Sequence, residues 1–522
     1  MLWFLTWIAH AHAADITLSE GEDIQDAIDG VVAGDTIELT AGTYEVDELT
    51  TKSDGTADAP ITLRAVPGET VTLLGSGQIL QVDHAHWLFD GIIFDGGFGA
   101  ADTIKVESSA NHTTLHNVEV RNSKRDCIEM EAPVGVTISN SEIHHCLFMD
   151  PDDGDRLDAH AITTGAVHSL TIENTKIHTF SGDGLHLGSG RTAPGWNDVR
   201  IDGCQIWLTP LTEETAGFAT GAITGENAIE TQTWNDAPTA NLEIKNSSFW
   251  GFQNGIDVSD QAAILVREHV NASISRTTVS GSNIAFRLRG PTSARPLGPT
   301  VHIDNTLIHD VITGIQYEDS LSQLKLWHVT MGLDITDHLV AVDSDSTAPD
   351  VQNSLFLADE LPEYAASEEH NLTATASDFV NPGAGDHRLA STSDAIDAGQ
   401  LISGMDFDRD GNERPQGDAP DVGAHEFTGT PDEPGDTGDT GEAEEDAPPD
   451  EADEPTETND TGANPDQNEP PNGIGAAEQV GEKGGCGCTT SPSTEGLPIW
   501  FLLVGIGLAR RDRKIRTEQF FT

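Results

Sequence analysis

The feature that most constrains this chain is a repeat that runs from about Ile79 to Glu360. Each copy holds a short strand such as 104–106, a small turn, a second strand such as 115–120 and a polar corner. Where nothing is inserted, the copies recur about every 22 to 25 residues, a period that is typical of solenoids. Further copies begin at Cys127, Ala161, Gly184, Ala228, Ala263, Ala285, Gly314 and Leu339.

Apolar residues alternate along each strand, as at Ile104 and Val106. Alternation places them on one side of the strand. One copy cannot bury that side alone, so stacked copies must form a continuous core. Asparagine recurs where the second strand meets the next corner, and there its side chain can satisfy backbone groups along the stack. We assign this structural role to Asn117, Asn140, Asn174, Asn246 and Asn305.

The N-terminal segment predicts an export signal followed by a cap. Residues 1–13 are apolar and end in Ala11-His12-Ala13, a small-x-small pattern that predicts a cleaved signal peptide. Residues 24–28 predict a short amphipathic helix, which would cover the open end of a solenoid core. We therefore assign residues 15–60 to a cap with entry strands and residues 61–377 to the solenoid.

The charge balance narrows the class of partner. The net charge is -62, from 88 acidic and 26 basic residues. Phosphate binding needs a basic surface, so this balance argues against nucleic acid and favours divalent cations. We expect a monomer.

The five cysteines are too thinly spread for a disulfide scaffold. Two of them, Cys486 and Cys488, lie near the end of the chain. We expect Cys127, Cys146 and Cys204 to be small buried residues, with one bridge between neighbouring turns as the alternative.

Three segments carry a resemblance to a known family. They read IQDAIDGVVAGDTIELTAGTYE, GTADAPITLRA and HWLFDGIIFDG. They resemble the entry of right-handed parallel β-helix proteins of the pectate-lyase superfamily, which includes secreted lyases that cleave alginate, chondroitin or pectin. The resemblance implies an all-β fold, a single-stranded right-handed parallel β-helix of about ten or more turns. It also implies a polysaccharide partner, and it says little about which polysaccharide.

Aligned copies predict three outward columns, because residues next to inward positions point to the opposite side of a strand. The first outward column is Lys105, Glu129, Thr163, His186, Glu230, Leu265, Arg287 and Gln316. The second outward column is Glu107, Glu131, Gln232, Arg267, Arg289 and Glu318. The entry column, at the strand starts, is Asp102, Asp126, His160, Asp183 and Asn227.

These columns place an acidic zone beside an arginine zone on one face. We expect Ca²⁺ to be held by Asp126, Glu129, Asp158 and Asp183, and sugar to be held by His186, Glu230 and Gln232. We assign catalysis to Arg267, Arg287 and Arg289. This arrangement suits β-elimination on a uronic-acid polymer, in which a cation neutralises the sugar carboxylate and a base removes the adjacent proton. Alternatively, the arginines only hold sugar carboxylates.

One departure from the family weakens the lyase hypothesis. Several β-helix lyases use a lysine base, whereas Gln232 occupies the position where a lysine would have been persuasive. A non-catalytic protein that binds glycan on the same face is therefore the main alternative. Another carbohydrate-active reaction, either hydrolysis or epimerisation, is the third.

The end of the chain predicts further segments. Residues 378–427 resemble a terminal module of bacterial surface β-helix proteins, and Asp406, Asp408 and Asp410 alternate in a loop that suits Ca²⁺. A solvated Asp-Gly turn is the alternative reading of that loop. Residues 428–483 predict a disordered acidic linker. Residues 484–516 contain an apolar segment at 497–509, which we expect to be a transmembrane segment, and a basic end. They resemble a myxobacterial-type C-terminal sorting signal, which implies a cell-surface protein. An ordinary single-pass membrane anchor is the alternative.

Overall fold

The computed structural model describes residues 13–188, 195–233, 238–253, 261–293, 295–318, 320–343 and 346–429. The chain separates into two compact units at Thr440, and all described residues belong to the first. The predicted sorting signal, its apolar segment and nearly all of the predicted signal peptide and linker lie outside the described residues. Within them, no helix has the length and hydrophobicity that a membrane crossing requires.

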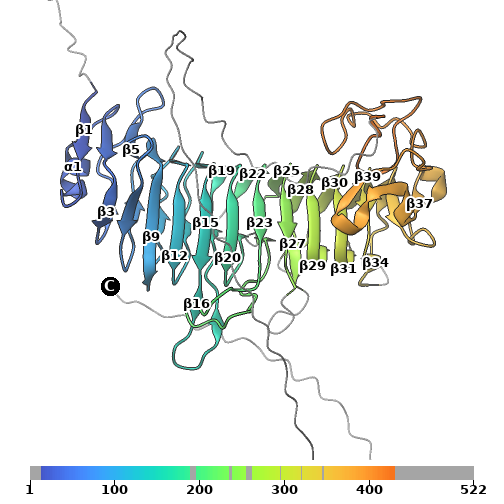
Figure 1. The fold of residues 1–522 in the computed structure, drawn as a ribbon, viewed down its shortest axis with the longest axis horizontal. Coiled ribbons are helices and arrows are strands. Elements are labelled where there is room, and N and C mark those ends of the chain that lie inside the picture. Colours follow the sequence, from blue (N-terminus) through green and yellow to red (C-terminus); the bar gives the residue numbers. More distant parts are fainter. Residues whose placement is uncertain are drawn as a thin grey trace, which may run out of the picture. The chain divides into compact units, whose positions relative to one another are not determined.

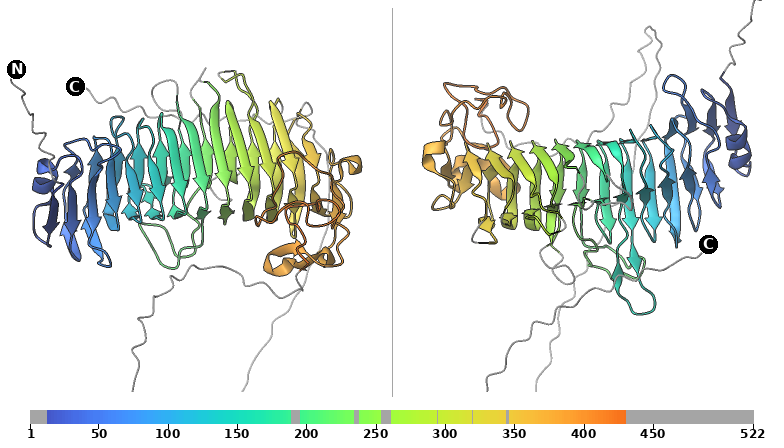
Figure 2. Two further views of the ribbon diagram at one scale, coloured as in Figure 1. Left: turned by 90° about the horizontal axis from the view of Figure 1, so that it is seen from above. Right: turned by 180° about the vertical axis from the view of Figure 1, so that it is seen from behind.

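The described chain winds into a parallel β-helix with three faces (Figures 1 and 2). Face A is a sheet of 13 strands, each paired in parallel with the strand one turn away. Its strands are β1 (Asp15–Leu18), β2 (Thr36–Leu39), β5 (Ile61–Ala65), β8 (Trp87–Asp90), β11 (Thr114–His116), β14 (Thr137–Ser139), β19 (His168–Glu173), β22 (Asn197–Asp202), β25 (Ala240–Lys245), β28 (Val270–Ser275), β30 (Thr300–Asp304), β32 (Gln323–Trp327) and β35 (Asp350–Gln352).

The second sheet, of 22 strands, covers the other two faces, because β29 (Thr278–Leu288) and β31 (Leu307–Tyr317) pair on both. Face B consists of these strands together with β3 (Gly42–Glu45), β6 (Val71–Leu74), β9 (Ile92–Gly99), β12 (Glu119–Ser123), β15 (Glu142–Cys146), β20 (Lys176–Phe180), β23 (Gln205–Trp207), β26 (Ser248–Trp250), β33 (Thr330–Met331), β36 (Leu355–Leu357) and β37 (Leu372–Ala374). Face C, which carries all three predicted columns, consists of the same two strands together with β4 (Leu49–Thr50), β7 (Leu80–Val82), β10 (Ile104–Val106), β13 (Ile128–Met130), β18 (Ile162–Thr164), β21 (Leu185–Leu187), β24 (Ile229–Thr231), β27 (Ala262–Val266) and β34 (Ile335–Ala341). The predicted all-β, parallel β-helix architecture is confirmed.

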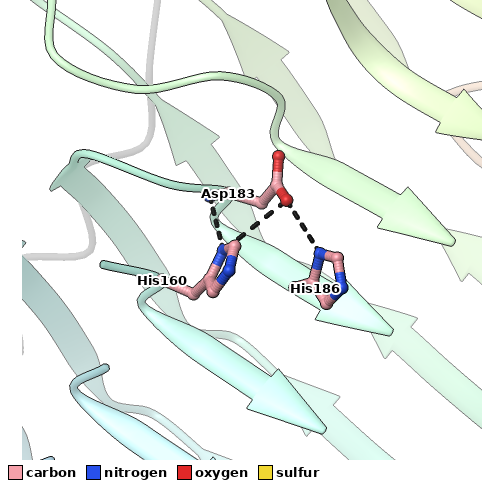
Figure 3. Close-up of side chains that lie close together, drawn as sticks. All are labelled: His160, Asp183 and His186. Carbon is pink, nitrogen blue, oxygen red and sulfur yellow. Dashed lines mark hydrogen bonds and ion pairs between the residues drawn. The ribbon is translucent and has the colours of Figure 1, made fainter. Parts of the chain in front are cut away.

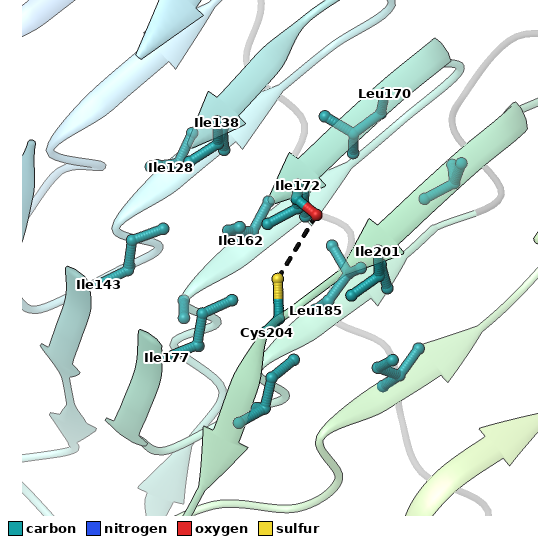
Figure 4. Close-up of a cluster of buried hydrophobic side chains, with 14 of the residues drawn as sticks. Ile128, Ile138, Ile143, Ile162, Leu170, Ile172, Ile177, Leu185, Ile201 and Cys204 are labelled. Carbon is teal, nitrogen blue, oxygen red and sulfur yellow. Dashed lines mark hydrogen bonds between the residues drawn. The ribbon is translucent and has the colours of Figure 1, made fainter. Parts of the chain in front are cut away.

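The core is the stack of inward side chains from all three faces (Figure 4). Ile128, Ile162 and Leu185 follow one another from turn to turn, and each is fully buried. At the N-terminal end, helix α1 (Ile24–Gly30) buries Ile24 and Ile28, as the amphipathic pattern predicts (Figure 1). The Asp23 side chain caps this helix by accepting the N–H of Gln25.

From Gly91 onward, the corner between faces A and B has one residue in the left-handed backbone region at every turn. All five predicted asparagines occupy it, with φ between 45° and 51°. Asparagine tolerates this region better than other non-glycine residues, which is why it recurs there. The same corner is formed by Gly91, Gly203, Arg276, His328 and Asn353 in other turns.

Asn140 offers a test of this corner, because it is exposed and has φ 51°. Asn140→Ala should lower the free energy of unfolding by about 1–2 kcal/mol, the cost of a left-handed alanine. Asn140→Gly should cost much less, because glycine adopts positive φ freely. Urea unfolding of both variants measures the difference, and equal losses would show that the asparagine side chain matters more than its backbone conformation.

The expectation that all three body cysteines are unpaired is wrong. Cys127 and Cys146 form a disulfide with Cα atoms 5.6 Å apart, which is the alternative that the sequence left open. Cys146 pairs in register with Ser123, and Cys127 follows Ser123 around the next corner, so stacking brings the two cysteines together. Cys204 is free and buried, and its thiol donates to the Ile172 carbonyl (Figure 4).

Two insertions leave the winding beside face C. The first forms a hairpin of β16 (Phe148–Met149) and β17 (Arg156–Leu157). The second, within residues 210–226, packs Leu211 and Phe218 against Leu147 at the base of that hairpin. Figure 2 shows both insertions protruding at the same edge of the stack.

The terminal module packs against the last turns around a second small core, which includes Leu355, Phe379 and Val422. Its short elements are η1 (Ser367–Glu369), η2 (Ala376–Asp378), β38 (Phe379–Asn381), η3 (Pro382–Ala384) and β39 (Asp386–Leu389). Arg414 ties the module to the β-helix, because its Nη2 donates to the corner residue Asn305 (3.1 Å). The guanidinium and the Glu426 carboxylate form a fully buried ion pair.

Candidate functional site

The strand register of face C reproduces the predicted columns. Glu129 pairs with Thr163, Thr163 with His186, and His186 with Glu230. The register continues through Leu265 to Arg287. The first outward column is therefore a true column, with its members about 4.8 Å apart.

The entry column forms a ladder of hydrogen bonds that the sequence did not predict. Each side chain accepts the backbone N–H of the next member, one turn along, so every position needs an acceptor. The bonds run from the Asp126 N–H to Asp102 (3.1 Å), from the His160 N–H to Asp126 (2.7 Å), from the Asp183 N–H to His160 (2.8 Å) and from the Asn227 N–H to Asp183 (3.2 Å).

The ladder sets the orientation of Asp183, which is almost completely buried. Its Oδ1 accepts the N–H and the side-chain amide of Asn227, and its Oδ2 accepts the Nδ1–H of His186 at 3.0 Å (Figure 3). These hydrogen bonds outweigh burial and hold the pKa of Asp183 below its ordinary value. Burial alone would lower the pKa of His186, but its bond to Asp183 raises it.

The two histidines beside Asp183 therefore hold different tautomers. A backbone N–H can only donate, so the Nδ1 of His160 is unprotonated and its proton is on Nε2. In His186 the proton is on Nδ1, which leaves Nε2 as an acceptor. The rings lie 4.6 Å apart (Figure 3), and a Cβ at position 182 would lie 2.6 Å from the His160 ring, which explains Gly182.

The next turn adds two carboxylates that lie beside two arginines. Arg156, on the hairpin, bonds to Glu226 at 2.5 Å, and Arg267 forms an ion pair with Glu230. Burial, with Asp183 nearby, raises the pKa of Glu230 to about 7. The same two causes raise the pKa of Glu226.

Oxygen atoms that could bind a cation gather at this point, around the predicted ligand Asp183. Carboxylate oxygens of Asp183, Glu226 and Glu230 lie within 4.8 Å of one another. Such an oxygen set fits Ca²⁺, which would add to the positive charge that Arg156 and Arg267 already place beside these carboxylates. His160, Asp183 and His186 also form a cluster, but Ca²⁺ prefers oxygen and both Nδ1 atoms are already hydrogen-bonded.

Of the four face C residues predicted to bind metal, only Asp183 lies in such a cluster among the described residues. Asp126 is held in the ladder, and burial raises its pKa to about 7. Glu129 lies 3.9 Å from the Lys105 ammonium. Asp158 is 55% exposed and lies 3.7 Å from the Arg156 guanidinium.

The predicted catalytic arginines all lie against carboxylates. Arg267 pairs with Glu230, whereas Arg287 and Arg289 share Glu318 at 4.0 and 3.6 Å. Arginine stays protonated at any pH at which proteins fold, so these positions suit anion binding better than proton abstraction. Gln232 is half-buried on the second outward column. Its backbone carbonyl accepts the Trp196 indole N–H at 3.1 Å.

The terminal loop uses its central carboxylate to organise itself. Asp408 is fully buried, and its two oxygens accept four hydrogen bonds, three from backbone N–H groups and one from the Asn412 amide. Asp410 lies 3.8 Å from the His425 imidazole. Asp406, Asp408 and Asp410 do not join either cluster of potential metal ligands found in the described residues.

Sequence reasoning assigned no role to His160, Glu226 or Arg156. His160 lies next to Asp183 in the predicted entry column, and this position could have indicated a role for His160. Arg156 and Glu226 lie 70 residues apart within two insertions, and nothing in the repeat relates them.

Comparison with known proteins supports the architecture. Residues 79–269 match the family described as right handed beta helix region. No curated protein sequence matches the chain significantly.

Several solved structures resemble this one at low identity. The pectate lyase Pel9A has a TM-score of 0.46 and 15% identity, covering 80% of this chain and 97% of its own. An alginate lyase from Paenibacillus sp. str. FPU-7 has a TM-score of 0.41 and 15% identity over 65% of this chain and 97% of its own. A PL6 family polysaccharide lyase from Pseudopedobacter saltans has a TM-score of 0.41 and 12% identity over 78% and 95%.

The family match and the strand register agree in the region where they overlap. The match covers the turns that carry the Asp183 cluster, and every strand pair on face C is parallel. The chain is a right-handed parallel β-helix protein.

Proposed function

We propose that face C binds an acidic, uronic-acid polysaccharide and cleaves it by β-elimination. The observation that carries this proposal is the Asp183–His186 pair, which presents an unprotonated imidazole nitrogen beside the Arg267–Glu230 ion pair. A neutral, oriented imidazole is a suitable general base near neutral pH. A neighbouring guanidinium is a suitable partner for a sugar carboxylate.

In this mechanism, Arg267 binds the carboxylate of the reacting sugar and stabilises the negative charge that develops there. His186 Nε2 takes the proton from the carbon next to that carboxylate. The electron pair forms a carbon–carbon double bond as the bond to the leaving oxygen breaks. His160, whose Nε2 carries its proton, lies in ring contact with His186 and is the donor for the leaving oxygen.

Asp183 has a positioning role, because its carboxylate keeps the His186 proton on Nδ1. Ca²⁺ would be held by Asp183, Glu226 and Glu230, and it would supply further positive charge for the sugar carboxylate.

We also propose that the protein acts outside the cytoplasm. The Cys127–Cys146 disulfide supports this location, because disulfides persist in oxidising compartments. The apolar N-terminal segment and the segment 484–516 motivate export and surface attachment, respectively.

The test is the ultraviolet absorbance of the unsaturated product during incubation with pectate, alginate or glycosaminoglycans. We expect absorbance to rise with at least one of them, and we expect a chelator to lower the rate if Ca²⁺ takes part. Isothermal titration of the same polymers is run in parallel. Binding without any rise in absorbance would contradict elimination and identify a glycan-binding protein instead.

A further inference from the structure

Charge changes sign along face C from one turn to the next. Turns 102–107 and 126–131 carry a cluster of acids. Turns 160–165 and 183–188 carry His160, Thr163, Asp183 and His186, with glycine in the second outward column. Turns 262–267 and 284–289 carry arginines. The register shows that these turns are consecutive except for turn 227–232, which lies between the second and third groups. The face therefore has an acidic end and a basic end, with the Asp183 cluster between them.

The acidic end holds more negative charge than its cations balance. Its acids are Asp102, Glu107, Asp126, Glu129 and Glu131, and its cations are Lys105 and Arg125. Lys105 contacts Glu107 at 3.1 Å and Glu129 at 3.9 Å, and Arg125 lies 3.6 Å from Asp102. Burial and the nearby Asp102 raise the pKa of Glu129 to about 7. Any further anion placed here meets like charge.

The middle of the face carries glycine in the second outward column. Gly165 and Gly188 occupy the second outward column beside Thr163 and His186. A Cβ on Gly165 would lie 2.3 Å from the Glu131 carbonyl, and a Cβ on Gly188 would lie 2.6 Å from the Thr164 carbonyl. Backbone packing therefore keeps side chains out of these two positions of the column beside His186.

The basic end can hold carboxylates in two successive turns. Arg267 and Arg289 follow Val266 and Leu288, which pair in register, so the two arginines are neighbours in the second outward column. Arg287 projects from the same turn as Arg289, and both lie near a single carboxylate, Glu318. Neighbouring turns are stacked roughly 5 Å apart, which is about the length of one sugar unit. One uronate can therefore lie over each turn.

We infer that the enzyme cleaves at the end of a polyuronate chain and releases short products. The acidic chain extends over Arg267 and Arg289, and only about one or two sugars reach beyond His186 before they meet the acids of turn 126–131. Glu129 and Glu131 are then the residues that exclude a longer acidic segment. This inference rests on the β-elimination proposed above.

The experiment follows products over time with the polyuronate on which elimination is detected, in a buffer above the pKa of Glu129. Early samples are separated by size and analysed by mass spectrometry. We expect mono- or disaccharides together with nearly intact polymer. A broad ladder of intermediate sizes would overturn the inference and leave elimination standing, whereas the absence of unsaturated product would overturn elimination itself.

The variant Glu129→Gln/Glu131→Gln removes charge from the acidic end without changing side-chain size. We expect the mean length of early products to increase severalfold. Glu173→Gln/Glu243→Gln is the matched control, because both residues project from strands of face A, and its product profile should equal that of the wild type. Unchanged short products from the first variant, with its melting temperature retained, would show that these acids do not limit the product.

A second variant tests the basic end independently. Arg289→Gln should raise KM for long polyuronates about five- to tenfold and leave KM for disaccharides unchanged, because only long chains reach turn 284–289. Equal KM values for wild type and variant on long chains would contradict the assigned direction of binding.

Discussion

Replacement of His186 by glutamine is expected to lower kcat of elimination by about two to four orders of magnitude, the usual contribution of a positioned general base. Glutamine can still hydrogen-bond to Asp183 but cannot take the proton. KM should change little, because the arginines that hold the substrate are untouched. Initial rates from product absorbance measure kcat, and titration calorimetry checks binding.

Asp183→Asn separates positioning from catalysis in the same site. The asparagine amide carries no negative charge with which to hold the Nδ1–H of His186, so the imidazole loses its preferred tautomer. We expect a loss comparable with that of His186→Gln, and the double variant should be no worse than either single one, because the two residues act as a unit. Additive losses would show that Asp183 acts apart from His186, and full activity of His186→Gln would exclude His186 as the base.

Arg414→Met is expected to lower the free energy of unfolding by about 3–5 kcal/mol, because it leaves the Glu426 carboxylate buried without a cation. The guanidinium also donates to the Asp421 carbonyl at 3.1 Å and to the Gly423 carbonyl at 2.8 Å, and these acceptors would lose their donor. Urea unfolding, followed by circular dichroism, measures the loss.

Two comparisons check the cause of that loss. Arg414→Met/Glu426→Met removes both charges and should be less destabilising than Arg414→Met alone. Arg388→Met breaks the ion pair between Arg388 and Asp386 in the same module, where the arginine side chain is 45% exposed. It should lower the free energy of unfolding by less than about 1 kcal/mol. Similar losses for Arg388→Met and Arg414→Met would contradict the assignment to an unpaired buried charge.

The outward columns could be predicted from the sequence alone. Lys105, Glu129 and His186 lie on one column because strands alternate with period two and turns stack in register. The corner asparagines follow from the same regularity, because each turn must reverse direction at an equivalent position. Both features depend on local conformation and repetition alone.

The roles of individual carboxylates did not follow from that regularity. Asp183 and Asp408 were both predicted to bind Ca²⁺, yet Asp183 bonds to His186 whereas Asp408 accepts bonds from its own loop. A carboxylate has two oxygens. The donors that reach those of Asp183 come from His186 and Asn227, whereas most of the donors to Asp408 come from its own loop. The calcium ligands that the sequence placed at Asp126 and Glu129 have other partners: Asp126 accepts the His160 N–H, and Glu129 lies beside Asp102 and Lys105.

The sequence by itself determined a parallel β-helix, the inward and outward assignment of its strands and the face on which charged residues gather. Period-two alternation and a repeating turn are sufficient for a solenoid and for the inward and outward assignment, and the resemblance of the entry segments implies the parallel β-helix. Only the tertiary structure decided that Cys127 bonds to Cys146, that Arg156 reaches Glu226, and that His160 and His186 carry their protons on different nitrogens. Each of these depends on contacts between turns or insertions, where distance in space is unrelated to distance along the chain.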